Sequence, residues 1–441
     1  MDFSALYGGV GSGLFTMVAF IVALSVIVAI HEYGHYIVGR WCGIHAEVFS
    51  LGFGPVLFSR VDKRGTKWQF AALPFGGYVK FLGDANAASA GTTGDVPEAE
   101  QRRTMHGAPL WARVLTVAAG PVFNFILAIA VISGVIMANG RSTDPLTYEG
   151  AIPLPPNYVN QLQAGDVLVA VEGMEIGGGQ DIIGALPLQP VINYQIRRDG
   201  RDMTVQGPYL MPSAVATFIP RSAADDAGLR GGDVITQIDG VPVVAFSQLI
   251  EAVAAAKGAP LVLTIWRDSK VLDVTLAPRA VDQTLPEGGF ETRYMIGVTG
   301  GVFFEEQTEK LGLGEALVAG SERVLFVITS SLSGMYHVLT GQISTCNLSG
   351  PVGIAETSGA MASQGGTSFL WLIGMLSAGV GLLNLFPVPI LDGGHLVFYA
   401  YEAVTRRKPS VAVYNVMMMM GLALIATLMI FAVFNDLLFC P

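Results

Sequence analysis

The chain has 441 residues, of which 51% are hydrophobic and 14% are charged, and its mean hydropathy is +0.52. These values are typical of a protein that crosses a membrane several times and also carries soluble parts. The net charge of −10 and the pI near 5.1 argue against nucleic acid as a partner. Cys42, Cys346 and Cys440 lie far apart without CxxC spacing, so they predict neither a thiolate zinc site nor a disulfide framework.

The first apolar segment, from about Gly13 to Val38, is long enough to cross the roughly 30 Å hydrocarbon core of a bilayer. Its start lacks a basic region, so we expect a retained span rather than a signal peptide. Near its end lies the motif HEYGH, residues 31–35. HExxH on a helix places two imidazoles one turn apart, where both can bind one Zn²⁺. Because ionisable groups in a span are costly, we interpret His31 and His35 as ligands and Glu32 as the base that deprotonates the bound water.

The loop that follows is expected to contain two strands, Glu47 to Arg60 and Thr66 to Phe81, around the turn Lys63-Arg64-Gly65. Glycines in both strands allow another backbone to approach closely. An extended peptide could therefore pair with the strand edges there. The candidate substrate-binding residues of this loop are Gly52, Phe53, Gly54 and Tyr78.

A second apolar segment, from about Val114 to Ala138, precedes a duplicated region. Residues 164–168 (AGDVL) are echoed by 231–235 (GGDVI), and residues 198–200 (RDG) by 267–269 (RDS). The offsets nearly agree, which predicts a repeated module of roughly 65–70 residues. Each copy is expected to form short strands around one helix, which is Phe246 to Ala256 in the second copy.

The stretch 227–240 (AGLRGGDVITQIDG) resembles PDZ domains, and 161–173 (QLQAGDVLVAVEG) is a weaker match to the same pattern. PDZ domains usually bind a peptide end by adding it as a strand to a sheet edge. Two interpretations stay open, because the modules could contact peptides or could be inert spacers.

Two more spans are predicted near the C-terminus. The third runs from about Phe369 to Phe386 and continues, broken by prolines, toward Val397, and the fourth runs from about Val413 to Phe434. Residues 324–340 are also apolar and could be counted as a fifth span. We prefer a surface-lying amphipathic helix for them, because they contain Ser330, Ser331, Ser333 and His337.

The distribution of Lys and Arg predicts the orientation of the spans. Basic residues occur in the loop between spans one and two and at 406–408 between spans three and four, but none precede span one or follow span four. Both basic loops should therefore face the cytoplasm. The termini and the region 139–367 should lie outside.

A third metal ligand is needed, because a catalytic zinc site has three protein ligands plus water. The metzincin pattern would need a histidine at position 41, which is Trp41. His45, His106 and His337 are interpreted as surface residues. Asp392 is the best candidate, because an acid at the end of a span is costly without a partner. Four spans, but not five, bring Asp392 to the depth of HEYGH.

Asp392 belongs to the segment NLFPVPILDGG, residues 384–394. Pro387 and Pro389 are expected to break the helix there and shape a cavity. His395 is expected to be a neighbour of the metal site rather than a ligand.

HEYGH, NLFPVPILDGG and the PDZ-like pair together resemble the site-2 protease family of intramembrane zinc metalloproteases. GPVFNF at 120–125, GFGP at 52–55 and GGYVKF at 76–81 are similar to its bacterial sigma-E regulator protease branch. The resemblance implies that the enzyme cleaves a single-span membrane protein, such as an anti-sigma factor in an envelope stress response. It also implies that Asn384 binds the exposed substrate backbone, and that the PDZ-like pair gates access as a size filter.

The predicted fold is a polytopic α-helical membrane protein with four spans, a cytoplasmic membrane-associated β-hairpin region and two external PDZ-like α+β domains. An alternative function is a non-catalytic membrane PDZ scaffold or receptor with a structural metal; a transporter is disfavoured by the absence of inverted repeats. The expected segments are span one (1–40), a cytoplasmic loop with hairpins and a flexible connector (41–110), span two (111–138), PDZ-like domains (139–212 and 213–282), an external linker with amphipathic helices (283–367), span three (368–400), a cytoplasmic loop (401–411), and span four with the external C-terminus (412–441).

Overall fold

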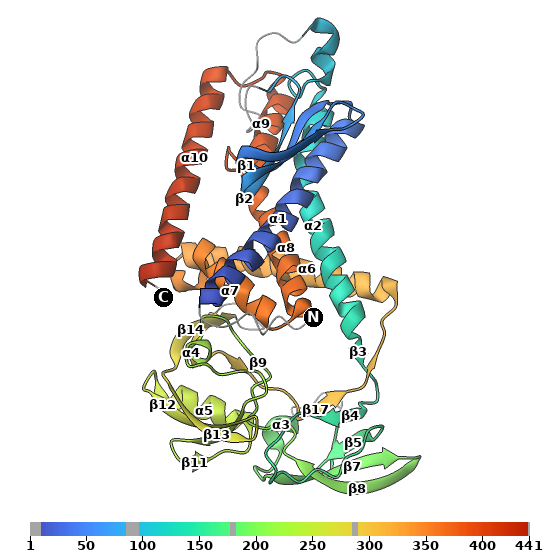
Figure 1. Cartoon of the computed structure of the whole chain (residues 1–441), viewed down its shortest axis with the longest axis vertical. Helices are drawn as coiled ribbons and strands as arrows, with labels where there is room; N and C mark the ends of the chain where they lie inside the picture. The colour runs from blue at the N-terminus through green and yellow to red at the C-terminus, as the bar shows by residue number, and fades with distance from the viewer. Residues whose placement is uncertain (1–9, 85–96, 177–181, 285–289, 440–441) are drawn as a thin grey trace. The chain divides into compact units, whose positions relative to one another are not determined.

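The computed structural model describes residues 10–84, 97–176, 182–284 and 290–439 (Figure 1). Contacts divide the chain into two compact units. The helical unit comprises Met1–Ile136, Gly312–Leu339 and Leu348–Pro441, and the strand-rich unit comprises Met137–Leu311 and Thr340–Asn347. A flexible connector is predicted at 85–100, and most of it, residues 85–96, lies outside the described residues.

Long helices form wherever the sequence predicted an apolar span. The third predicted span corresponds to two helices, α8 and α9, and the others to one helix each. The helices of this unit are α1 (Val10–Trp41), α2 (Leu110–Asn139), α6 (Leu313–Leu339), α7 (Pro351–Ser363), α8 (Gly366–Asn384), α9 (Asp392–Thr405) and α10 (Val411–Phe434), with the short turns η2 (Glu98–Arg103) and η4 (Asn435–Phe439).

The break between α8 and α9 follows from its prolines. Proline has no amide hydrogen and disfavours a helical residue before it, so α8 ends ahead of Pro387 and Pro389. Helix α9 then begins at Asp392. A Cβ at Gly393 would lie 2.3 Å from the carbonyl oxygen of Leu385, so glycine is needed for α9 to start directly against the break. The break therefore places Asp392 at the first position of a helix.

A hairpin of β1 (Ala46–Val61) and β2 (Lys67–Phe81) packs against α1 and α2 near the end of α1 that carries HEYGH. Phe49 of β1 pairs in register with both Val79 and Trp68 of β2. The Phe49 and Trp68 rings lie 4.3 Å apart between centroids, and Tyr36 of α1 stands edge-on to both. This buried cluster holds the hairpin beside the motif.

The outer half of the hairpin leaves that cluster and exposes large apolar side chains. Leu57 is 73% exposed and Phe58 is 61% exposed. The other exposed apolar residues there are Phe53, Val56, Val61, Phe70 and Leu73.

Five helices in the described part of the chain are long and apolar enough to cross a membrane, namely α1, α2, α6, α8 and α10. The chain is therefore a multi-pass membrane protein. Residues 324–340, most of which belong to α6, were expected to form a helix on the membrane surface. In Figure 1 α6 runs across α2 and α8 instead of alongside them, and its residues Gly320 and Val324 are buried. The number of spans stays a prediction, because α6 qualifies by length and composition.

The strand-rich unit contains two four-stranded antiparallel sheets with matching strand orders, β6-β5-β7-β8 and β11-β10-β12-β13. A helix lies between the second and third strand of each sheet in sequence: α3 (Ile182–Ala185) and α5 (Phe246–Ala256). The strands are β5 (Val167–Val171), β6 (Met174–Glu175), β7 (Val191–Arg198), β8 (Arg201–Pro208), β10 (Val234–Ile238), β11 (Val241–Pro242), β12 (Leu261–Arg267) and β13 (Lys270–Leu276).

The remaining elements of this unit are short. The helical pieces are α4 (Ala223–Asp226) and η3 (Thr345–Asn347). The strands form the pairs β3 (Arg141–Ser142) with β18 (Thr308–Glu309), β4 (Tyr148–Ala151) with β17 (Phe304–Glu306), β9 (Thr217–Phe218) with β16 (Val298–Thr299), and β14 (Arg279–Thr284) with β15 (Phe290–Met295).

Each of the two sheets contains an Arg–Asp ion pair at the equivalent position. The Nε and Nη2 atoms of Arg198 each donate to the Asp166 carboxylate at 2.6 Å, and those of Arg267 donate to Asp233 at the same distances. Each carboxylate also accepts the amide hydrogen of the residue three positions earlier, Gln163 or Arg230, at 2.8 Å. Each pair joins the turn before the first sheet strand to the end of the third.

Cys346 is disulfide-bonded, whereas Cys42 is free. The cysteine spacing did not predict this disulfide. Separation along the sequence does not limit which cysteines meet in a fold, because only the local distance and direction of the Cβ atoms matter. Cys440 lies outside the described residues.

Candidate active site

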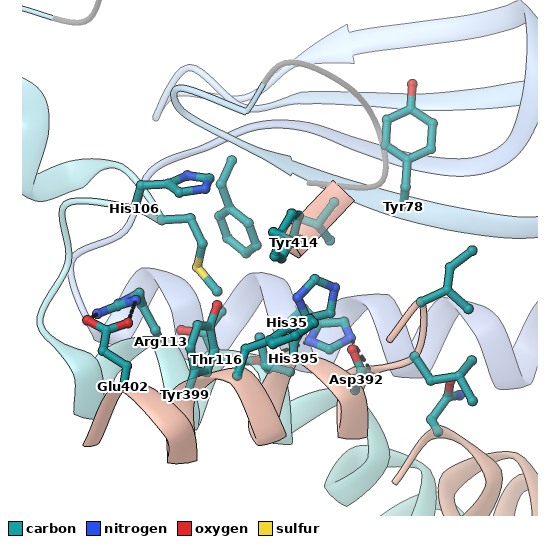
Figure 2. Close-up of a pocket in the computed structure, with 18 of the residues that line it drawn as sticks. His35, Tyr78, His106, Arg113, Thr116, Asp392, His395, Tyr399, Glu402 and Tyr414 are labelled. Carbon is teal, nitrogen blue, oxygen red and sulfur yellow. Dashed lines mark hydrogen bonds and ion pairs between the residues drawn. The ribbon is translucent and has the colours of Figure 1, made fainter. Parts of the chain in front are cut away.

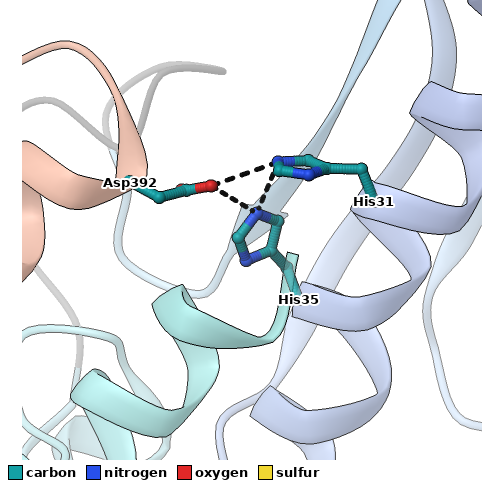
Figure 3. Close-up of side chains that lie close together, drawn as sticks. All are labelled: His31, His35 and Asp392. Atoms are coloured by element: carbon teal, nitrogen blue, oxygen red, sulfur yellow. Dashed lines mark hydrogen bonds and ion pairs between the residues drawn. The ribbon is translucent and has the colours of Figure 1, made fainter. Parts of the chain in front are cut away.

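Helix α1 presents His31 and His35 on one face, as their spacing of four residues requires (Figure 3). Their Nε2 atoms lie 3.1 Å apart, and their rings meet edge to face. Both rings are polar, and both are largely buried within an apolar helix. Two polar rings facing each other in this setting need a shared partner.

Asp392 supplies the third group from the start of α9 (Figure 3). Its Oδ2 atom lies 3.2 Å from Nε2 of His31 and 3.5 Å from Nε2 of His35. That oxygen is buried and has no partner of good hydrogen-bond geometry among the described residues. These three residues are the one His, Cys, Asp or Glu cluster of metal-binding spacing found in the described part of the chain.

The three separations of 3.1, 3.2 and 3.5 Å suit a metal ion. A tetrahedral zinc with bonds of about 2.0–2.1 Å requires its ligand atoms to be about 3.3 Å apart. Two imidazoles and one carboxylate are also a donor set that zinc accepts while keeping a fourth position open. The buried, unpartnered Oδ2 atom of Asp392 therefore fits a metal ligand.

Helix α2 supports both imidazoles from behind. The backbone carbonyl of Thr116 lies 2.9 Å from Nδ1 of His35, and the side-chain amide of Asn124 lies 3.1 Å from Nδ1 of His31. Gly120 lies between them, and a Cβ there would come within 2.3 Å of His35 Nε2. Sequence reasoning missed these three roles, although the GPVFNF motif contains Gly120 and Asn124.

A cavity of about 490 Å³ opens beside the three residues (Figure 2). Glu32, the predicted base, lines it together with both histidines and Asp392. Asn384 at the end of α8 and Tyr78 of β2 also line the cavity. His395 does so too, although it does not belong to the metal-binding cluster.

The other predicted substrate-binding residues are not among those that line the cavity. Gly52 and Gly54 have positive φ angles of 89° and 85°, which glycine adopts readily, and Phe53 between them stacks on Tyr78 with a centroid distance of 6.0 Å. Pro387 and Pro389 lie in the break between α8 and α9, and Pro389 packs against Gly421 of α10.

The far end of the cavity holds a buried ion pair that the sequence did not reveal (Figure 2). Arg113 of α2 donates to both carboxylate oxygens of Glu402 on α9, at 2.9 and 2.6 Å, and its guanidinium lies 5.1 Å from the centre of the Tyr399 ring. The pair ties the helix that supports the histidines to the helix that carries Asp392. His106, which was interpreted as a surface residue, is exposed and also lines the cavity.

Comparison with known proteins agrees with this arrangement. The family model described as "Peptidase family M50" matches residues 19–428. Relatives that carry the name "putative zinc metalloprotease" occur in Agrobacterium fabrum (35% identical, covering 96% of this chain and 95% of the relative), Rhizobium meliloti (33%, 96% of each) and Vibrio cholerae (30%, 96% and 98%).

One solved structure, a solution structure from Geobacillus thermodenitrificans, aligns with 18% of this chain and 84% of its own at 28% identity. Its TM-score of 0.15 is too low to bear on the fold. The family match covers nearly the whole chain and includes HEYGH and Asp392. The chain therefore belongs to peptidase family M50, the site-2 protease family of zinc metalloproteases.

Proposed function

We propose that this protein is an intramembrane zinc metalloendopeptidase that hydrolyses a peptide bond within or near the transmembrane segment of a single-span membrane protein. The observation that carries the proposal is the meeting of His31, His35 and Asp392 within apolar helices, beside a cavity that Glu32 also lines. Family membership supports the metalloprotease class.

His31, His35 and Asp392 would hold the zinc ion. When bound there, zinc lowers the pKa of a coordinated water toward about 7 and polarises a carbonyl group. Glu32 lies one residue after His31, on the same turn of α1, and faces the same cavity. Glu32 would take the proton of the attacking water and then deliver it to the leaving amine.

A membrane-spanning substrate arrives as an α-helix, whose backbone carbonyls are already hydrogen-bonded within the helix and covered by side chains. A transmembrane substrate must therefore unwind before it is cut. We propose that Asn384 bonds its exposed backbone, that Gly52, Phe53, Gly54 and Tyr78 guide it along the hairpin, and that Pro387 and Pro389 shape the entrance.

For the topology we propose four spans, formed by α1, α2, α8 with α9, and α10, with α6 at the membrane surface. Both termini and the strand-rich unit would then lie on the periplasmic side of a bacterial inner membrane. The disulfide at Cys346 supports this side for residues 340–347, because disulfides persist in oxidising compartments.

We further propose that the two four-stranded sheets belong to PDZ-like modules that gate substrate access. Their matching strand order and matching ion pairs support a duplicated module. We propose that the substrates are single-span proteins already shortened outside the membrane, such as an anti-sigma factor in stress signalling.

The test is Glu32→Gln in the full-length chain, purified in detergent with a model single-span substrate. We expect product formation to fall at least about 100-fold, because a positioned base contributes that much, while zinc content stays near normal. Mass analysis of the products and metal analysis give the two readouts. Glu251→Gln, which changes an exposed carboxylate on α5, is the matched control and should cleave normally.

A chelator should also stop cleavage by the unaltered chain, and added Zn²⁺ should restore it. Cleavage that survives Glu32→Gln or complete zinc removal would contradict the proposed chemistry. An unaltered chain that holds zinc but cuts no single-span protein would favour the non-catalytic scaffold.

A further inference from the structure

Helix α2 contacts the same ring nitrogen of both histidines. Nδ1 of His35 faces the Thr116 carbonyl at 2.9 Å, and Nδ1 of His31 faces the Asn124 amide at 3.1 Å. Thr116, Gly120 and Asn124 are spaced by four residues, so they share one face of the helix. This face lies directly behind the two rings, and Gly120 leaves the space that the rings occupy.

A histidine that binds a metal through Nε2 carries its hydrogen on Nδ1, and that hydrogen needs an acceptor. For His35 the acceptor is a backbone carbonyl, which can only accept. For His31 the Nδ1 partner among the described residues is a side-chain amide, which can donate or accept depending on its rotation. Asn124 is therefore the group that decides how His31 is oriented.

Asn124 is fully buried, and its Oδ1 atom has no hydrogen-bond partner among the described residues. Burying an amide oxygen in an apolar bundle without a hydrogen bond is costly. Half a turn about the terminal side-chain bond exchanges the positions of Oδ1 and Nδ2. The oxygen then faces Nδ1 of His31 and accepts the hydrogen that a zinc-binding imidazole must donate.

We propose that Asn124 is a positioning residue of the metal centre, whose side-chain oxygen accepts the Nδ1 hydrogen of His31 and holds Nε2 toward His35 and Asp392. This inference rests on the zinc site of the proposed function. It gives GPVFNF a physical role: Gly120 makes room for the rings, and Asn124 orients one of them. The Asn124 backbone is held separately, because Ser377 of α8 donates to its carbonyl at 2.8 Å.

The experiment measures zinc affinity of the purified full-length chain by competition with a fluorescent chelator, with the visible spectrum of the Co²⁺-substituted form as a second readout. Asn124→Leu removes the acceptor at similar volume and should weaken zinc binding by about 10- to 100-fold, the usual cost of losing such a support. Asn124→Asp keeps an acceptor and should restore affinity to within a few-fold of the unaltered chain. It should also restore the Co²⁺ spectrum.

Ser377→Ala is the matched control, because it removes a buried hydrogen bond to the same residue without touching the ring. It should bind zinc normally. If the Asn124→Leu chain does not fold, Asn124→Ala carries the same expectation without added apolar bulk.

Normal zinc affinity in the Leu and Ala variants would overturn the role of Asn124 and leave the proposed function intact. An equal loss in the Asp variant would overturn it too, because the accepting oxygen would then be present without supporting His31. An unaltered chain that never binds zinc would overturn the proposed function itself.

Discussion

Three polar side chains inside the apolar helical unit each face a group on another helix. Arg113 pairs with Glu402, His35 faces a carbonyl of α2, and Asp392 faces two imidazoles. Removing one member leaves the other buried and uncompensated, which costs more than the pair contributes. Residue-scale tests are therefore sharpest where one partner of a buried pair is changed.

The Asp166–Arg198 pair of the strand-rich unit offers such a test. Burial raises the pKa of Asp166, but the hydrogen bonds from Arg198 and the Gln163 amide, together with the charge of Arg198, outweigh burial and hold the pKa below its usual value. The stabilisation is therefore present above the unfolded-state pKa of about 3.9 and is lost as the pH falls through the lower folded-state pKa.

We expect Asp166→Asn to destabilise its sheet by about 3 kcal/mol at pH 7, the low end of the range for a broken buried pair, because Arg198 remains partly exposed. Hydrogen exchange of the β5 and β7 amides in the intact chain measures this. Asp202→Asn, which breaks the exposed pair with Arg197, should change exchange little. The difference in sheet stability between the unaltered chain and Asp166→Asn should become smaller as Asp166 protonates at low pH. A difference in stability that stays constant down to pH 2 would contradict this account.

At the scale of elements, the close approach of α1 and α2 depends on glycine. A Cβ at Gly34 would lie 2.6 Å from the Ala119 carbonyl oxygen, and one at Gly120 would lie within 2.7 Å of both imidazoles. The two helices can therefore meet with the rings between them only where side chains are absent.

Gly120→Ala should displace both rings and abolish zinc binding, as measured by chelator competition on the purified chain. The matched control is Gly134→Ala on the same helix, where nothing lies within 4 Å of the added methyl group. That variant should bind zinc normally, since alanine favours a helix over glycine by about 1 kcal/mol. An equal loss of zinc binding in both variants would indicate that any change in α2 disturbs the site, and would contradict the steric argument.

The elements also mark what the sequence can and cannot predict. The apolar helices and the pairing of the HEYGH histidines could be predicted, because they depend only on segment length, charge and local spacing. Asp392 could be proposed from the cost of a charge in a span. The Thr116 carbonyl could not, because any residue supplies a carbonyl, and its use depends on how α2 packs 81 positions after His35. The crosswise course of α6 is likewise decided by packing against α2 and α8, not by its composition.

For the whole molecule, the central question is which side of the membrane each loop faces. With four spans the loop after α9 is cytoplasmic, whereas a fifth span at α6 would place it outside. A cysteine replacing Arg407, which is exposed in that loop, distinguishes the two cases in a Cys42→Ser background.

We expect a membrane-impermeant thiol reagent to label Arg407→Cys in inverted vesicles but not in intact spheroplasts. Lys270→Cys, at an exposed turn of the strand-rich unit, is the reference and should show the opposite pattern. Labelling of both positions from the same side would require an even number of crossings between them, as a fifth span at α6 provides, and would reject the four-span arrangement.

The outer half of the β1–β2 hairpin bears on how the molecule can be handled. Leu57, Phe58 and Phe70 are exposed on strands that extend away from their own buried cluster. A patch of this kind on a protein seldom stays in contact with water. An annulus of detergent or a nanodisc must therefore cover this hairpin as well as the helices, and solubilising agents too small to reach it would leave the protein prone to aggregate through it.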